Sequence, residues 1–65
     1  QPRYEGSDRQ ARGRILSALR ESETAVDSNL LVDMSADRDQ MLRALESLES
    51  EGLIRRVGRA FALPL

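Results

Sequence analysis

The pattern of hydrophobic and polar residues divides the 65-residue chain into a helical part and a short C-terminal ribbon. Over residues 8–22 the apolar side chains recur at the spacing of one helix face, namely at Ala11, Ile15, Ala18 and Leu19, with Leu16 on the flank. Ser7, followed by Gln10 three residues later, is typical of a capping box, which predicts that the helix begins after Ser7. Asp8 and Arg12 lie four residues apart, so we expect an ion pair between them on the helix surface.

The middle of the chain predicts a short extended stretch followed by two more helices. Residues 24–26 form the stretch, residues 29–33 form a short second helix, and a longer third helix ends at Gly52, a typical residue just after a helix terminus. The apolar stripe predicted for the third helix is Met41, Leu42, Ala44, Leu45 and Leu48. Candidate caps precede both helices, Asp27 or Ser28 for the second and Ser35 or Asp37 for the third.

Residues 53–63 predict a β-hairpin with a two-residue turn at residues 58–59 that begins in glycine. This turn sets a register in which the facing pairs are Val57 with Ala60, Arg56 with Phe61, and Ile54 with Leu63. One side of the hairpin is then apolar, and the stem of Arg56 lies along the ring of Phe61. The agreement between the turn and the apolar side supports the hairpin.

The order of the predicted elements is helix, short strand, helix, helix, hairpin. This order predicts a mainly α domain with a small antiparallel β-hairpin, the winged helix-turn-helix architecture of three helices plus a wing. We expect the domain to span residues 7–65 and residues 1–6 to form a linker or an arm. A plain three-helix bundle is the alternative architecture.

The composition removes several kinds of chemistry. The chain has no cysteine and no histidine, which excludes disulfides, metal ligation by thiolate or imidazole, and catalysis by either residue. The carboxylates lack the spacing of a calcium loop. We therefore assign no catalytic residue, no metal ligand and no cofactor to this chain. No apolar run approaches the ~20 residues of a membrane span, and the start does not resemble a signal peptide, so we expect no membrane partner and a cytoplasmic location.

The third helix is acidic, although the third helix of a winged helix is the element that enters the major groove of DNA. Residues 37–51 carry a net charge of −3, and the chain as a whole carries −1. Arg43 is expected to pair with Asp39 four residues before it and with Glu46 three residues after it, which predicts a solvated helix with internal ion pairs. If the helix reads base edges instead, its outward residues for that role are Gln40, Arg43 and Ser47.

Arginines supply all the positive charge of the chain and are concentrated outside the third helix. The hairpin carries Arg55, Arg56 and Arg59, and a ribbon of this kind can hold the phosphate backbone without reading sequence. Arg9 and Arg20 of the first helix are further candidates for backbone contacts. The alternative for the hairpin arginines is that they prevent aggregation of an exposed strand edge.

Gly13 lies in the interior of the first predicted helix, opposite the apolar stripe. Ser17 follows one turn later, and Gln10 flanks the same face, so small side chains form a shallow groove there. Another domain or a phosphate backbone can approach closely at such a place, and Gly13, Ser17 and Gln10 are the candidates for packing against another domain. The alternative is a tolerated surface glycine, at a cost of ~1 kcal/mol relative to alanine.

The stretch Tyr4–Arg20, with the sequence YEGSDRQARGRILSALR, resembles a segment of actinobacterial adenine DNA glycosylases just after the iron–sulfur cluster region. Residues 52–64 are similar to the short C-terminal domain of that group. The resemblance implies a parent enzyme that flips out and removes adenine mispaired with guanine or 8-oxoguanine, in base-excision repair. It also implies an iron–sulfur cluster in the parent protein, whereas the family's catalytic acids, cluster cysteines and helix-hairpin-helix have no matching positions in this chain.

These observations support three hypotheses about function. In the first, the chain is an accessory C-terminal domain of an adenine DNA glycosylase, with duplex DNA and the catalytic domain of the same polypeptide as partners. In the second, it is the DNA-binding module of a transcriptional regulator, and the third helix reads bases. In the third, it is a protein-interaction module whose acidic helix meets a basic partner.

Overall fold

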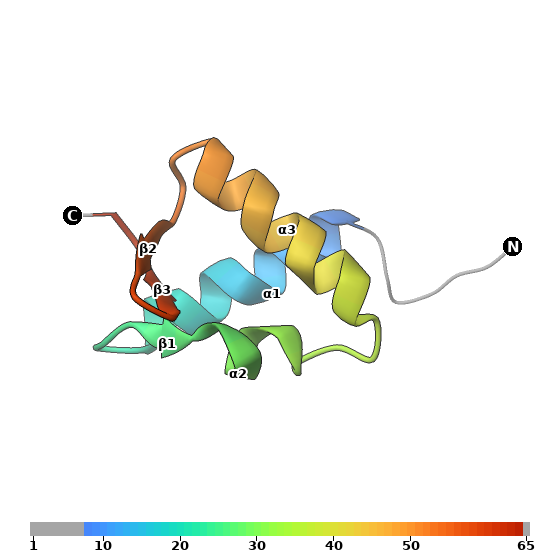
Figure 1. Ribbon diagram of the computed structural model, residues 1–65, viewed down its shortest axis with the longest axis horizontal. Coiled ribbons are helices and arrows are strands. Elements are labelled where there is room, and N and C mark those ends of the chain that lie inside the picture. Colours follow the sequence, from blue (N-terminus) through green and yellow to red (C-terminus); the bar gives the residue numbers. More distant parts are fainter. Residues whose placement is uncertain (1–7, 65) are drawn as a thin grey trace, which may run out of the picture.

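The computed structural model describes residues 8–64 and shows three helices with a small three-stranded sheet (Figure 1). In chain order the elements are α1 (Asp8–Glu21), β1 (Val26–Asp27), α2 (Ser28–Val32), α3 (Arg38–Ser50), β2 (Arg55–Val57) and β3 (Ala60–Ala62). The sheet is antiparallel in the order β1-β3-β2, and its hairpin is the wing of a winged helix. The predicted fold class is confirmed, while the proposed linker at residues 1–6 and the Ser7 cap lie outside the described residues.

Every helix and the wing contribute side chains to one hydrophobic core. Its buried members are Ala11, Ile15, Leu19, Leu31, Val32, Met41, Ala44, Leu45, Leu48, Ile54 and Phe61. The prediction that Leu42 belongs to the apolar stripe of α3 is wrong, because this side chain is 50% exposed. Leu42 is three residues after Asp39 and four before Glu46, and both of these side chains are exposed, so all three lie on the outward side of the helix.

Aspartates begin the second and third helices. The side chain of Asp27 accepts a 2.7 Å hydrogen bond from the amide of Asn29, and the side chain of Asp37 accepts a 3.0 Å bond from the amide of Gln40. Each satisfies a backbone donor that has no partner within the first helical turn. Of the predicted pairs of candidate caps, the aspartate is the cap in both helices.

Gly52 ends α3 in the way that the sequence predicts. Its φ of 79° is in the left-handed region, which favours glycine. The amide of Gly52 donates to the carbonyl of Glu49 at 3.0 Å, and the amide of Leu53 donates to the carbonyl of Leu48 at 2.9 Å. This pair of bonds is a Schellman motif, which satisfies two of the carbonyls at the end of the helix and directs the chain into the wing.

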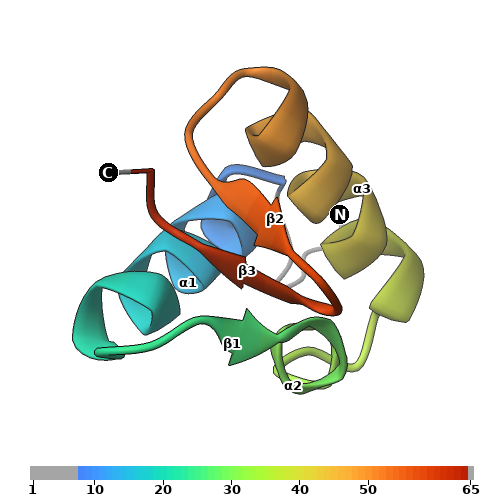
Figure 2. The same ribbon diagram turned by 60° about the vertical axis from the view of Figure 1, so that its left-hand side comes forward.

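The wing has the predicted register, with Val57 facing Ala60 and Arg56 facing Phe61. The guanidinium carbon of Arg56 lies 4.7 Å from the centroid of the Phe61 ring, as expected for a side chain lying across it. Figure 2 shows β3 in the middle of the sheet, between β2 and the short strand β1. Strand β1 begins two residues later than the extended stretch predicted at residues 24–26, because only Val26 and Asp27 pair with β3.

Candidate nucleic-acid interface

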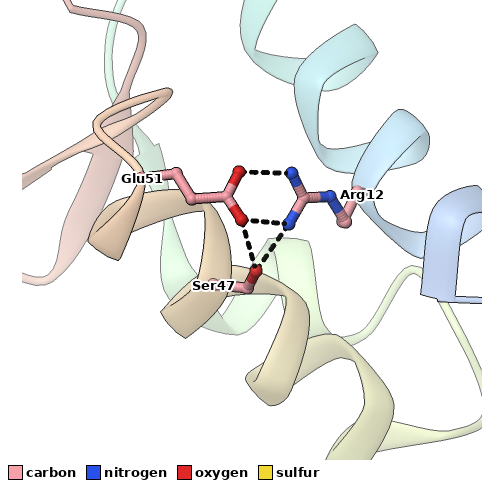
Figure 3. A network of polar contacts seen from close by, with 3 residues as sticks. All are labelled: Arg12, Ser47 and Glu51. Carbon is pink, nitrogen blue, oxygen red and sulfur yellow. Dashed lines mark hydrogen bonds and ion pairs between the residues drawn. The ribbon is translucent and has the colours of Figure 1, made fainter.

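Arg12 of α1 holds the C-terminal end of α3 through a network of polar contacts (Figure 3). Its guanidinium forms two hydrogen bonds to the carboxylate of Glu51, at 2.8 and 3.3 Å, and a third to the hydroxyl of Ser47. The hydrogen bonds from Arg12 are the main reason why the pKa of Glu51 is lowered, and the Glu51 carboxylate in turn raises the pKa of Arg12. The predicted Asp8–Arg12 ion pair is therefore wrong, because Arg12 turns toward α3 instead.

Two of the three base-reading candidates face α1. The hydroxyl of Ser47 lies between Arg12 and Glu51, and the side-chain amide of Gln40 donates to the carboxylate of Asp8 at 3.2 Å. The structure therefore corrects the placement of Gln40 and Ser47 on the outward face of α3, since both are half-buried at its edge. Arg43 is exposed, as predicted.

Two carboxylates at the C-terminal end of α3, those of Glu49 and the capping residue Glu51, are neutralised by other elements rather than within the helix. Among residues 8–64, Arg43 makes no ion pair, so its predicted ties to Asp39 and Glu46 are wrong. Instead, Arg12 of α1 pairs with Glu51, and Arg56 of the wing pairs with Glu49. The acidic end of the helix is thereby engaged inside the domain. Within residues 8–64, the outward face keeps two carboxylates without an ion-pair partner, those of Asp39 and Glu46, and one such guanidinium, that of Arg43.

A hollow of about 490 Å³ separates the outward face of α3 from the wing. Its lining includes Asp39, Leu42, Arg43, Glu46, Arg56 and Phe61. The two free carboxylates repel phosphate, and the half-exposed leucine between them offers an apolar contact. The same lining holds two arginines, of which Arg56 is already paired with Glu49, so the charges that are not engaged in ion pairs are two carboxylates and the guanidinium of Arg43 among the described residues.

The wing presents two free arginines, Arg55 and Arg59, and one that is engaged. Arg56 donates to Glu49 at 3.1 and 3.3 Å while it lies over Phe61, so its charge is used to hold the wing against α3. Arg55 and Arg59 are exposed, and neither has an ion-pair partner within the described part of the chain. Of the three hairpin arginines predicted to contact phosphate, these two have their charge available for it.

The outer side of α1 carries the remaining candidates. Arg9 and Gln10 are exposed, and Arg20 is exposed while it donates to the hydroxyl of Ser17 at 3.3 Å. A Cβ atom added at Gly13 meets nothing within 4 Å, so no contact within the described chain requires a glycine there. The surface around Gly13 is open, and the role predicted for it in domain packing stays a prediction.

The structure brings together two candidates that are distant in the sequence, Arg20 and Arg55. Both line a second hollow of about 430 Å³ between the end of α1 and the wing. Arg9, near the start of α1, does not line it.

The spacing of residues in the sequence did not predict the Arg12–Ser47–Glu51 network. Arg12 and Glu51 are 39 positions apart, and no local pattern indicates that they are in contact.

None of the helices in residues 8–64 is long and apolar enough to cross a membrane. Within the same range there is no group of three or more aspartate, glutamate, histidine or cysteine side chains placed to hold a metal ion.

The fold and the arrangement of its charges define a small winged-helix module with an acidic third helix and exposed arginines on the wing and α1. Over 63 residues the chain is 48% identical to the adenine DNA glycosylases of two strains of Mycobacterium tuberculosis, a match that covers 94% of this chain and 21% of each relative. It is also 46% identical over 55 residues to the adenine DNA glycosylase of Mycolicibacterium smegmatis, covering 83% of this chain and 19% of the relative.

The resemblance to actinobacterial adenine DNA glycosylases is confirmed by these matches. The chain spans about a fifth of the length of the curated relatives it matches. No family model and no solved structure matches it.

Proposed function

We propose that this chain is an accessory C-terminal module of an adenine DNA glycosylase, which binds the backbone of duplex DNA and carries no chemistry itself. The observation that supports it most is the 48% identity to such enzymes over nearly the whole chain. In this proposal the parent protein removes adenine mispaired with guanine or 8-oxoguanine, contains an iron–sulfur cluster and works in the cytoplasm. The module adds affinity to that enzyme.

The free arginines of the wing support contact with DNA backbone. Arg55 and Arg59 can each neutralise one phosphate, and each phosphate neutralised adds about 0.9 to the slope of log affinity against log salt. Such contacts carry no sequence information. Because the module would be linked to an enzyme already bound to the same duplex, even weak contacts raise the affinity through a high effective concentration.

The open face of α1 supports packing against the catalytic domain. Gly13 and Gln10 are exposed there, Ser17 is half-buried, and a Cβ at position 13 has free space around it in the module alone. In the proposed arrangement the catalytic domain occupies that space. Gly13→Ala is then expected to weaken the attachment of the module to the enzyme while the isolated module keeps its fold.

Fluorescence anisotropy with two short labelled duplexes tests the proposal, one with adenine opposite 8-oxoguanine and one fully paired. The 65-residue chain is expected to bind both equally, to bind more weakly as salt rises from about 50 to 200 mM, and to lose affinity on Arg55→Ala or Arg59→Ala. Arg38→Ala is the matched control, because Arg38 is already paired with Asp33. Absence of binding at the lowest salt contradicts the proposed DNA contact.

A test within the whole enzyme uses a mycobacterial adenine DNA glycosylase with and without the matching segment. Removal of the segment is expected to raise KM for the mispaired duplex and to leave kcat near its original value. A fall in kcat on removal of the segment, with KM unchanged, contradicts the accessory role, because it places the segment in the chemical step.

A second candidate function, binding of a basic protein segment by α3, is favoured by the hollow beside the wing. Leu42 is half-exposed between the unpaired carboxylates of Asp39 and Glu46. Leu42→Glu is expected to abolish binding of such a partner, whereas Arg55→Ala is expected to leave that binding unchanged. A transcriptional regulator, the remaining hypothesis, requires instead a sequence preference in duplex binding that Arg43→Ala removes.

A further inference from the structure

The last turn of α1, the loop after it and the outer strand of the wing surround the hollow of about 430 Å³ described above. Its apolar lining includes Leu19 and Leu63, and its polar lining includes Arg20, Arg55 and Glu23. The two arginines are 35 positions apart in the sequence, and the fold places them around one opening. This opening lies on the wing side of α1 and shares no lining residue with the hollow beside α3.

Both arginines keep donors and charge available for a ligand. Arg20 donates one hydrogen bond to the Ser17 hydroxyl, which leaves other N–H groups of its guanidinium unused. Within residues 8–64 neither Arg20 nor Arg55 has a carboxylate partner, unlike Arg12, Arg38 and Arg56. A guanidinium in this state binds a phosphate through two parallel hydrogen bonds.

We infer that this hollow is a phosphate-binding site for the backbone of duplex DNA, with Arg20 and Arg55 as its ligands. The inference rests on the proposed function and specifies where the duplex lies: across the wing and the C-terminal end of α1, away from α3. The lining of the hollow beside α3 has two carboxylates, Asp39 and Glu46, against one arginine without an ion-pair partner in residues 8–64, Arg43, because Arg56 is paired with Glu49. The lining of this hollow has two such arginines against one carboxylate, Glu23. The sign of the local charge therefore favours the α1 side for a polyanion.

The salt dependence of duplex binding by the 65-residue chain tests the site. Arg20→Ala and Arg55→Ala should each reduce the slope of log affinity against log salt by about 0.9, and Arg20→Lys should keep the slope because it keeps the charge. Arg43→Ala is the matched control, since Arg43 is also exposed and unpaired within the described residues but belongs to α3. Glu23→Gln should tighten binding.

Two results separate the failure of this inference from the failure of the proposed function. If the chain binds duplex DNA but Arg43→Ala lowers the slope as much as Arg20→Ala does, or Arg20→Ala leaves it unchanged, the site is overturned and the DNA-binding role is kept. If the chain does not bind duplex DNA at low salt, both are overturned. Circular dichroism of each variant confirms that the fold is retained, which is expected because both arginines are exposed.

Discussion

Replacement of glycine by alanine should have opposite effects on stability at Gly52 and Gly13. Gly52 has a φ of 79° at the end of α3, and a residue with a Cβ atom in the left-handed region costs roughly 1–2 kcal/mol. Gly13 lies in the interior of α1, where a Cβ atom meets nothing within 4 Å. Alanine is favoured over glycine in a helix interior by roughly 0.8–1.0 kcal/mol, so Gly13→Ala should stabilise the domain.

Thermal unfolding followed by circular dichroism measures both effects on one scale. In a domain of this size a change of 1 kcal/mol shifts Tm by roughly 4–8 °C, so the two variants should melt clearly on opposite sides of the unchanged chain. Urea unfolding gives an independent value for each difference in free energy. Shifts of the same sign would refute the reasoning, and a destabilising Gly13→Ala would show that this face is packed within the isolated domain.

Three further predictions concern the core, a helix cap and the Arg12–Ser47–Glu51 network between α1 and α3. Phe61→Ala should cost about 3–5 kcal/mol, because this side chain of β3 is buried in the core, and should lower the midpoint of urea unfolding strongly. Asp37→Ala should cost about 0.5–2 kcal/mol by removing the cap of α3, seen as a lower urea midpoint without a change in m. Glu51 should stabilise the fold above the ordinary glutamate pKa of 4.5 and lose this effect as the pH falls through its lowered pKa, so the difference in unfolding free energy between the unchanged chain and Glu51→Gln should shrink on acidification.

The sequence predicts local features of this fold well because their causes are local. Asp37 caps α3 through an amide three residues away, Gly52 ends the same helix through its own backbone freedom, and the turn at residues 58–59 sets the register that places Arg56 on Phe61. Each of these features depends on residues within a few positions of one another, so spacing alone predicts it.

The polar partners of the helices could not be predicted in this way. Spacing along a helix suggested that Arg12 pairs with Asp8 and Arg43 with Asp39, but it contains no information about a helix packed alongside. Arg12 and Glu51 are 39 positions apart in the sequence. Their contact forms instead of the Asp8–Arg12 pair because Arg12 donates two hydrogen bonds to the Glu51 carboxylate and one to Ser47. The same packing places Ser47 against α1, although the helical spacing predicted that it lies on the outward face.

The ion pair between Arg56 of the wing and Glu49 of α3 means that a residue of α3 affects the net positive charge of the wing surface. With Glu49 in place the wing shows two uncompensated guanidinium groups, and Glu49→Gln would leave the charge of Arg56 uncompensated as a third. In the proposed function, a substitution at Glu49 therefore changes the affinity of the wing for DNA, although Glu49 lies on another element and does not contact the nucleic acid. Related proteins can differ in affinity through this one position while the arginines of the wing stay the same.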